Sequence, residues 1–177
     1  MNLEAEILRR RDMRDILTFT IDPSEAKDFD DAISFAVTDT GDYQVGVHIA
    51  DVTHFVPLGN KVNREAYERG TSVYLVDRVL PMLPEKFCND LCSLRPGEDK
   101  LCMSVIFTLA RDARVLKHKV CRTVIRSDYR LAYHGIELEQ PVSRADGPTG
   151  NRAVRLVYAG CLGRTYDLDT VLEAVAE

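Results

Sequence analysis

The feature that most constrains this chain is a short acidic segment, residues 22–31, with the sequence Asp-Pro-Ser-Glu-Ala-Lys-Asp-Phe-Asp-Asp. It places five carboxylates and one amine within ten residues, and we call it the acidic turn. Side chains alternate between the two faces of a strand, so Asp28 and Asp30 would point one way and Asp31 the other. The segment must therefore bend if its four aspartates are to converge.

Converging carboxylates repel one another and raise one another's pKa values unless a cation joins them. A hard divalent ion such as Mg²⁺ or Mn²⁺ suits a set of carboxylate oxygens. Held by short aspartate side chains and by water, such an ion can generate a metal-bound hydroxide and stabilise a phosphoryl transition state. The acidic turn is therefore compatible with hydrolysis of phosphodiesters or phosphomonoesters.

Two plainer interpretations of the acidic turn stay open at this point. Asp22 could cap a helix that starts at Pro23, with Glu25 reaching back, or the carboxylates could line a solvated turn between strands. Two other sites are excluded. A calcium-binding EF-hand loop starting at Asp28 would need an oxygen ligand and then glycine where Ala32 and Ile33 stand. A haloacid-dehalogenase-type phosphatase would need an aspartate where Ser24 stands.

The amino-acid composition is typical of a soluble globular protein. The chain has 177 residues, 45% of them hydrophobic and 29% charged, enough for one domain or slightly more. It has no apolar run of the ~18 to 20 residues that a membrane span needs, and its start lacks the character of a signal peptide. These observations predict a cytoplasmic location.

The five cysteines lack the spacing of a disulfide framework, which predicts reduced thiols. Cys88 and Cys92 lie four residues apart without a second pair nearby, so buried structural thiols are favoured over a zinc site.

The net charge of −5 argues against a protein that binds nucleic acid by bulk attraction, though not against an enzyme that threads nucleic acid past a metal. Each basic cluster is compatible with phosphate contacts, and more commonly with a solvated surface. The clustered arginines are Arg9, Arg10, Arg11, Arg14, Arg64, Arg69, Arg78, Arg122, Arg126 and Arg130.

Alternation and turn residues by themselves predict only a mixed α/β fold. The expected elements are strands at 17–21, 33–37, 43–49, 101–110 and 115–125, and helices at 60–69 and 84–94. Residues 134–150 lack hydrophobic periodicity and predict a loop, with helices expected at 151–162 and 169–176.

Three single residues invite functional interpretations. His48 and Asp51 lie three residues apart near a strand end, but a hydrogen-bonded structural histidine is the commoner case. Tyr74 lies on a proline-marked extended segment, where an aromatic ring can stack on a nucleotide base or simply pack.

The string from Arg10 to Ala32 closely resembles the start of the catalytic domain of the ribonuclease II / ribonuclease R family, called the RNB domain. The resemblance continues, in order, through the motifs Val47-His-Ile-Ala-Asp-Val52, Arg69-Gly-Thr-Ser-Val-Tyr74, Val79-Leu-Pro-Met-Leu-Pro84 and Leu91-Cys-Ser-Leu94. Among the branches of this family, the chain looks most like ribonuclease R. The resemblance implies an α/β (α+β) fold with a mixed, largely antiparallel sheet and flanking helices. By this resemblance, 1–15 is a stub before the domain, 16–133 is the N-terminal part of the RNB domain, and 134–177 is a tail that does not match.

The resemblance implies processive, hydrolytic 3′-to-5′ degradation of single-stranded RNA to nucleoside 5′-monophosphates with Mg²⁺, or Mn²⁺ in its place, as cofactor. By position, Asp22, Asp28 and Asp31 resemble the metal-holding carboxylates. Asp30 resembles the carboxylate that engages the terminal ribose and supports catalysis, and Tyr74 resembles the aromatic clamp on the last RNA base.

Family members also carry OB-type RNA-binding domains before this region and an S1-type domain after it. The rest of their catalytic domain supplies an arginine for the scissile phosphate, whose loss typically costs ~10² to 10³ in rate. The sequence therefore predicts weak catalysis or none from this chain alone, and low stability or self-association through the face that the rest of the domain would cover. Two alternatives stay open: an inactive metal- or RNA-binding remnant, and an unrelated metal-dependent phosphatase.

Overall fold

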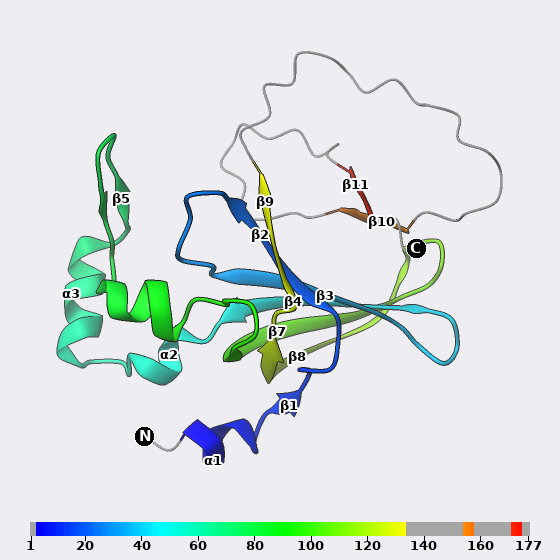
Figure 1. Cartoon of the computed structure of the whole chain (residues 1–177). Coiled ribbons are helices and arrows are strands. Elements are labelled where there is room, and N and C mark those ends of the chain that lie inside the picture. The colour runs from blue at the N-terminus through cyan, green and yellow to red at the C-terminus, as the bar shows by residue number, and fades with distance from the viewer. Residues whose placement is uncertain (1–2, 134–153, 158–170, 175–177) are drawn as a thin grey trace. The chain divides into compact units, whose positions relative to one another are not determined.

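The computed structural model describes residues 3–133, 154–157 and 171–174. The chain divides into two compact units, Met1–Ile136 and Glu137–Glu177. Figure 1 shows the elements of the first unit, in which a twisted sheet carries helices at one end of its strands. No helix within the described residues is long and apolar enough to cross a membrane.

The first unit is built on a seven-stranded sheet with the order β1-β8-β7-β4-β3-β2-β9. Only the outer pairs β1–β8 and β2–β9 are parallel, so the sheet is mixed and largely antiparallel, as predicted. The strands are β1 (Arg11–Asp12), β2 (Thr18–Pro23), β3 (Asp31–Val37), β4 (Tyr43–Ala50), β7 (Asp99–Leu109), β8 (Val115–Arg126) and β9 (Tyr129–Tyr133).

Two tight turns fix the register of the central strands. β3 and β4 are joined around Gly41, whose φ of 80° belongs to the left-handed region that glycine adopts freely. β7 and β8 are joined around Ala113, which has a φ of 65°. Both hairpins were predicted from alternation, because each one pairs segments that are neighbours in the sequence.

Short helices and a small hairpin follow β4 in the chain (Figure 1). They are α2 (Val52–Phe55), α3 (Lys61–Arg69), the hairpin of β5 (Val73–Tyr74) and β6 (Val79–Leu80), and the π-helix η1 (Phe87–Leu91), while α1 (Leu3–Ile7) precedes the sheet. The predicted caps of α3 are confirmed. Asn60 accepts a hydrogen bond from the Asn63 amide, and Gly70 ends the helix in the left-handed conformation.

The hydrophobic core lies where the acidic turn and η1 pack against the sheet. It comprises Met13, Phe29, Ala32, Ala50, Cys92, Leu94, Cys102, Ile106 and Ile125. Cys92 and Cys102 are thus buried packing residues, and Cys88, Cys92, Cys102 and Cys121 are all free thiols. The prediction of reduced thiols is confirmed for these four, while the predicted burial holds for Cys92 and not for Cys88, which is half-buried. Cys161 lies outside the described residues.

A row of buried polar side chains crosses the sheet, and we call it the polar strip: Thr18, Ser34, His48, Ser104 and Thr123. Its centre is His48, whose Nδ1 lies 2.7 Å from the Ser104 hydroxyl and whose Nε2 lies 2.8 Å from the Ser34 hydroxyl. A Cβ atom on neighbouring Gly46 would come within 2.4 Å of the Ser34 oxygen, so glycine is required there. His48 is therefore a structural histidine, as the sequence favoured.

The opposite face of the sheet is apolar, and several of its side chains are exposed among the described residues. Val47 lies opposite Val105, which in turn lies opposite Val120, so one apolar row runs across β4, β7 and β8. In the next row Ile49 lies opposite Met103, and both are exposed.

Two sequence-based interpretations are wrong. Asp22 lies within β2, so no helix starts at Pro23. Helices were expected at 151–162 and 169–176, but the described parts form the antiparallel strands β10 (Val154–Val157) and β11 (Val171–Ala174). Valine and leucine favour strand pairing, which outweighs the weak helical pattern. The rest of these two ranges, and the predicted loop, lie outside the described residues.

Candidate active site

The acidic turn joins two adjacent strands at one end of the sheet. Asp22 is the fifth residue of β2 and Asp31 is the first residue of β3, and the two strands are antiparallel. Asp28 and Asp30 lie in the connection between them. Adjacent strand ends therefore hold the first and last aspartates, as the predicted strand before Asp22 and the predicted hairpin after the turn had indicated.

The segment after η1 anchors one side of the turn. The Phe29 amide donates to the Ser93 hydroxyl at 3.1 Å, and that hydroxyl donates to the Lys27 carbonyl oxygen at 2.9 Å. The Leu94 amide donates to the Phe29 carbonyl oxygen at 2.8 Å. Because the Phe29 ring is buried in the core, these bonds fix the backbone between Asp28 and Asp30.

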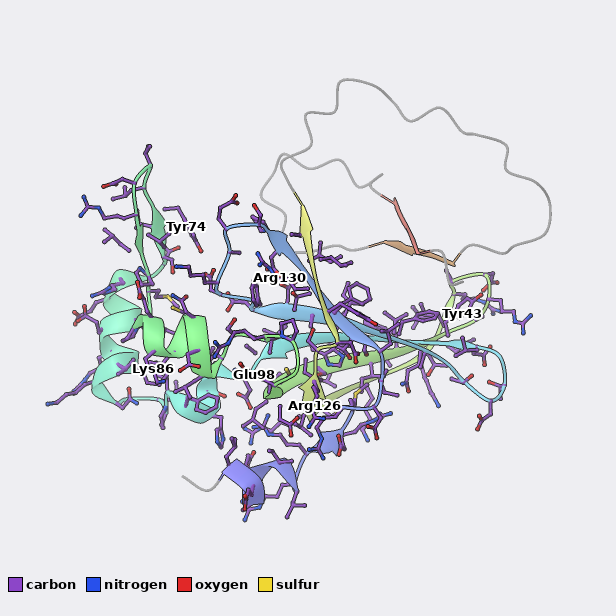
Figure 2. The ribbon with its side chains drawn as sticks, viewed as in Figure 1. Tyr43, Tyr74, Lys86, Glu98, Arg126 and Arg130 are labelled. Carbon is purple, nitrogen blue, oxygen red and sulfur yellow. The ribbon has the colours of Figure 1, made fainter. Side chains whose placement is uncertain are left out.

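Arg130 on β9 anchors the other side (Figure 2). Its Nη2 donates to the carbonyl oxygens of Pro23 at 2.8 Å and Ser24 at 2.6 Å, and its guanidinium carbon lies 4.9 Å from the centre of the Phe29 ring. The sequence had favoured a solvated surface role for Arg130, and this was wrong. The local pattern gives no signal, because the contact depends on β9 pairing with β2 about 110 residues earlier in the chain.

The carboxylates share one electrostatic environment. Loss of hydration raises the pKa of Asp30 to about 6, with further increases from the charges of Asp28, Asp31 and Asp22. Burial likewise raises the pKa of Asp22, to which Asp31 and Asp28 also contribute, while Thr20 and Arg130 oppose the shift. Burial also raises the pKa of Asp31. The protein therefore holds these carboxylates at a cost in desolvation and, for Asp30 and Asp22, in repulsion, which a bound cation would reduce.

One oxygen of this set has no partner in the folded chain. Asp22 Oδ2 is buried, and among the described residues it accepts no hydrogen bond. Buried polar atoms are normally satisfied, so such an atom calls for a ligand, a water or an ion. Carboxylate oxygens are the donors that Mg²⁺ and Mn²⁺ prefer, so the residues present fit a divalent cation by their chemistry.

The described residues do not, however, place three acidic, histidine or cysteine side chains in the arrangement of a metal site. Asp22, Asp28 and Asp31 are electrostatically coupled, but their oxygens are not gathered around one point. The binding of a metal ion by these three aspartates therefore stays a prediction.

Tyr74 reaches the acidic turn from β5 (Figure 2). Its hydroxyl donates to Asp28 Oδ2 at 3.3 Å, although the two residues are 46 positions apart, and 68% of the tyrosine remains exposed. Desolvation and the negative charge of Asp28 raise the pKa of Tyr74, so its hydroxyl keeps its proton.

Tyr74, Asp28 and Asp30 line a cavity of about 240 Å³. Its other walls come from the end of β4, the β5–β6 region and η1, namely Ile49, Ala50, Val52, Ser72, Met82, Leu83, Cys88 and Cys92. The cavity thus combines an exposed aromatic ring, two carboxylates and an apolar wall, which is a suitable arrangement for a planar, polar-edged group such as a nucleoside.

His48 and Asp51 do not form a catalytic pair. The Asp51 carboxylate accepts hydrogen bonds from Arg10 at 2.6 Å and from Thr53 at 2.6 Å. Burial would raise the pKa of Asp51, but these bonds outweigh it and lower the pKa. Asp51 therefore joins the N-terminal segment to the sheet, and His48 belongs to the polar strip.

Comparison with known proteins agrees with this geometry. The model of the RNB domain matches residues 10–159, so the match begins inside the stub that we expected and continues beyond Tyr133. Ribonuclease R of Thermotoga maritima is 48% identical over 142 residues, which are 79% of this chain and 20% of that protein. The chain spans between 14% and 20% of the length of the curated relatives that it matches.

Solved structures give the same result. Mycoplasma genitalium RNase R in complex with double-stranded RNA is similar with a TM-score of 0.70 and 33% identity, covering 75% of this chain and 24% of that one. Yeast Ssd1, a pseudonuclease, is similar with a TM-score of 0.68 and 26% identity, covering 75% of this chain and 16% of that one. The chain belongs to the RNB-domain family, that of ribonuclease II and ribonuclease R.

Proposed function

We propose that this chain carries the acidic, nucleotide-binding part of a hydrolytic 3′-to-5′ exoribonuclease site. The substrate would be the 3′ end of single-stranded RNA, the products nucleoside 5′-monophosphates and the cofactor Mg²⁺, with Mn²⁺ as a substitute. Membership of the RNB family supports this proposal, as does a similar RNase R whose structure contains single-stranded RNA.

The observation that carries the proposal is the contact of Tyr74 with Asp28 at the rim of the cavity that Asp30 also lines. Separate parts of the chain thereby bring a base-sized aromatic surface next to a group of aspartates. An aromatic ring beside carboxylates suits a substrate with a base at one end and a phosphate, bridged by a metal ion, at the other.

In this proposal, Asp22, Asp28 and Asp31 would hold a divalent ion that activates water and stabilises the charge of the scissile phosphate. The chain's own residues do the rest. Tyr74 stacks on the terminal base, and its hydrogen bond to Asp28 sets the ring beside the carboxylates. Asp30 accepts a hydrogen bond from the ribose, whose 2′-hydroxyl distinguishes RNA from DNA.

A second candidate function is a metal- or RNA-binding remnant without turnover. One observation favours it: a similar structure, that of yeast Ssd1, is of a pseudonuclease. It shares the metal-binding step with the first candidate and lacks hydrolysis.

The test incubates the purified chain with 5′-labelled single-stranded RNA, in Mg²⁺ or in chelator, and resolves the products on a gel. We expect slow, metal-dependent shortening in the wild type and at least a hundredfold loss in Asp30→Asn, because the group that engages the terminal ribose is lost. Glu25→Gln is the matched control, since it removes a charge from the same turn without touching a proposed ligand.

Binding of Mn²⁺ by calorimetry runs in parallel on the same proteins. Shortening that Asp30→Asn abolishes and Glu25→Gln preserves supports the exoribonuclease. Mn²⁺ binding without shortening at any protein concentration supports the remnant. Absence of both would refute both candidates, and cleavage of a generic phosphomonoester without nucleotide release would indicate a phosphatase.

A further inference from the structure

We infer that Arg130 is a positioning residue for the acidic turn: it bends the backbone between Asp22 and Asp28 and leaves their carboxylates free for a cation. This inference rests on the proposed function for the identity of the cation, but the bending itself is a property of the folded chain. It assigns a role to a residue outside the acidic turn.

The first argument is the place of Arg130 in the sheet. β9 pairs in parallel with β2, and Arg130 lies opposite Thr20, two residues before Asp22. Its side chain extends toward the turn that follows β2 (Figure 2). There Nη2 meets the carbonyl oxygens of Pro23 and Ser24 at 2.8 and 2.6 Å, with that of Ala26 at 3.5 Å.

These three carbonyls all belong to the backbone between the first two aspartates. A single cation that gathers three carbonyl oxygens forces the chain to curl around it, because each C=O dipole must point toward the same charge. The Ala26 amide also donates to the Pro23 carbonyl oxygen at 3.0 Å, which closes the curl as a turn.

The second argument is what Arg130 does not bind. Within the described residues it forms no ion pair, whereas other arginines of the first unit bind carboxylates directly. Arg14 and Arg126, for example, both pair with Asp99, at 2.8 and 2.6 Å. Arg130 lies close enough for its charge to favour ionised Asp22, yet Asp22 Oδ2 keeps no partner among those residues.

This combination suits a support for a metal site. A cation that bound the aspartates would compete with the metal ion for their oxygens, but a cation bound to carbonyls lowers the repulsion and leaves the oxygens available. Groups that orient ligands without contacting the metal typically contribute 10- to 100-fold to metal affinity, roughly.

The third argument concerns arginine itself. A planar guanidinium can donate to several carbonyls in its plane while its face lies over an aromatic ring, here Phe29 at 4.9 Å. The ammonium of lysine keeps the charge but lacks the planar group. Arg130→Lys therefore keeps the positive charge and removes the planar guanidinium, whereas Arg130→Gln removes the charge and keeps an amide donor.

The experiment compares wild type, Arg130→Lys, Arg130→Gln and the control Arg126→Gln, which removes an arginine charge at the end of β8 (Figure 2). Hydrogen exchange of peptides that cover residues 22–31 reports the order of the turn without metal, and calorimetry reports Mn²⁺ affinity. Thermal unfolding identifies any variant that does not fold.

We expect Arg130→Gln to speed exchange in residues 22–31 and to weaken Mn²⁺ binding about tenfold or more, with Arg130→Lys intermediate and Arg126→Gln within about twofold of wild type. Wild-type exchange in Arg130→Gln would overturn the inference, as would faster exchange with unchanged Mn²⁺ affinity. If Arg130→Gln does not fold, the same comparison with Arg130→Lys decides.

Failure of the proposed function gives a different result. Wild-type protein that binds no Mn²⁺ would refute the metal site, while the exchange data would still show whether Arg130 holds the turn.

Discussion

The acidic turn and the polar strip are both groups of polar side chains within the same sheet unit, and they are satisfied to different degrees. In the polar strip, His48 bonds to both Ser34 and Ser104, and Ser104 lies 2.6 Å from the Thr123 hydroxyl. In the acidic turn, carboxylates with raised pKa values crowd together, and an oxygen of Asp22 has no partner in the described part of the chain.

The difference teaches how to separate structure from function among buried polar groups. A network whose members hydrogen-bond to one another adds to stability and leaves no unpaired donor or acceptor for a ligand. A set that is charged, crowded and unsatisfied costs stability, and such a cost is typical of a site that awaits a cation or substrate. Substitutions in the two regions should therefore affect different measurements.

The largest effect on stability is expected for His48→Ala. It removes a fully buried ring and leaves the hydroxyls of Ser34 and Ser104 without their shared partner. We expect a loss of about 3 kcal/mol in the free energy of unfolding, measured by urea denaturation, with Mn²⁺ affinity unchanged. His118→Ala, at an exposed position on β8, is the control and should cost little. A fall in Mn²⁺ affinity without loss of stability would contradict the separation.

The next effect concerns pH. Burial lowers the pKa of His48 from 6.5 to about 4. Because the folded pKa is below the unfolded one, the unfolded chain takes up this proton first as the pH falls. His48 thus leaves stability unchanged above pH 6.5 and lowers it between pH 6.5 and 4, by about 3 kcal/mol in total.

The measurement is the difference in unfolding free energy between wild type and His48→Ala at several pH values. This difference should shrink as the pH falls from 6.5 to 4, because only the wild type carries the penalty. A difference that stays constant over this range would show that His48 is protonated in the folded protein.

The smallest effect, and one of opposite sign, is expected for Asp22→Asn. Replacing a crowded, buried carboxylate by a neutral amide should raise the free energy of unfolding by about 0.5 to 1 kcal/mol and weaken Mn²⁺ binding. The matched control is Asp128→Asn, because Asp128 accepts a hydrogen bond from the Thr18 amide at 2.8 Å and should therefore lose stability. Equal destabilisation in both variants would contradict the view that Asp22 is held at a cost.

Much of the framework could be predicted because it depends on neighbours in the sequence. Alternation around the turns at Gly41 and Ala113 predicted both central hairpins, and Asn60 and Gly70 predicted the ends of α3. The motif order also identified the family and placed Tyr74 with the aspartates before any contact was known.

The anchors of the site could not be predicted, because the interacting groups are far apart in the chain. Ser93 reaches the Phe29 amide across 64 positions, and Arg130 reaches Pro23 across 107. Neither residue differs in local pattern from an ordinary serine or a surface arginine. The two predicted C-terminal helices failed for a related reason, since Val154–Val157 and Val171–Ala174 are strands only by pairing with each other.

The sequence by itself determined the family, the hairpins and the concentration of negative charge in residues 22–31. Only the tertiary structure decided that Asp22 is a buried strand residue with an unsatisfied oxygen and that Asp28 accepts a hydrogen bond from the Tyr74 hydroxyl. It also decided that Arg130 binds backbone carbonyls and, within the described residues, no carboxylate. The physical reason is that charge and propensity are local properties. Burial, desolvation and hydrogen-bond partners depend on which distant strands become neighbours.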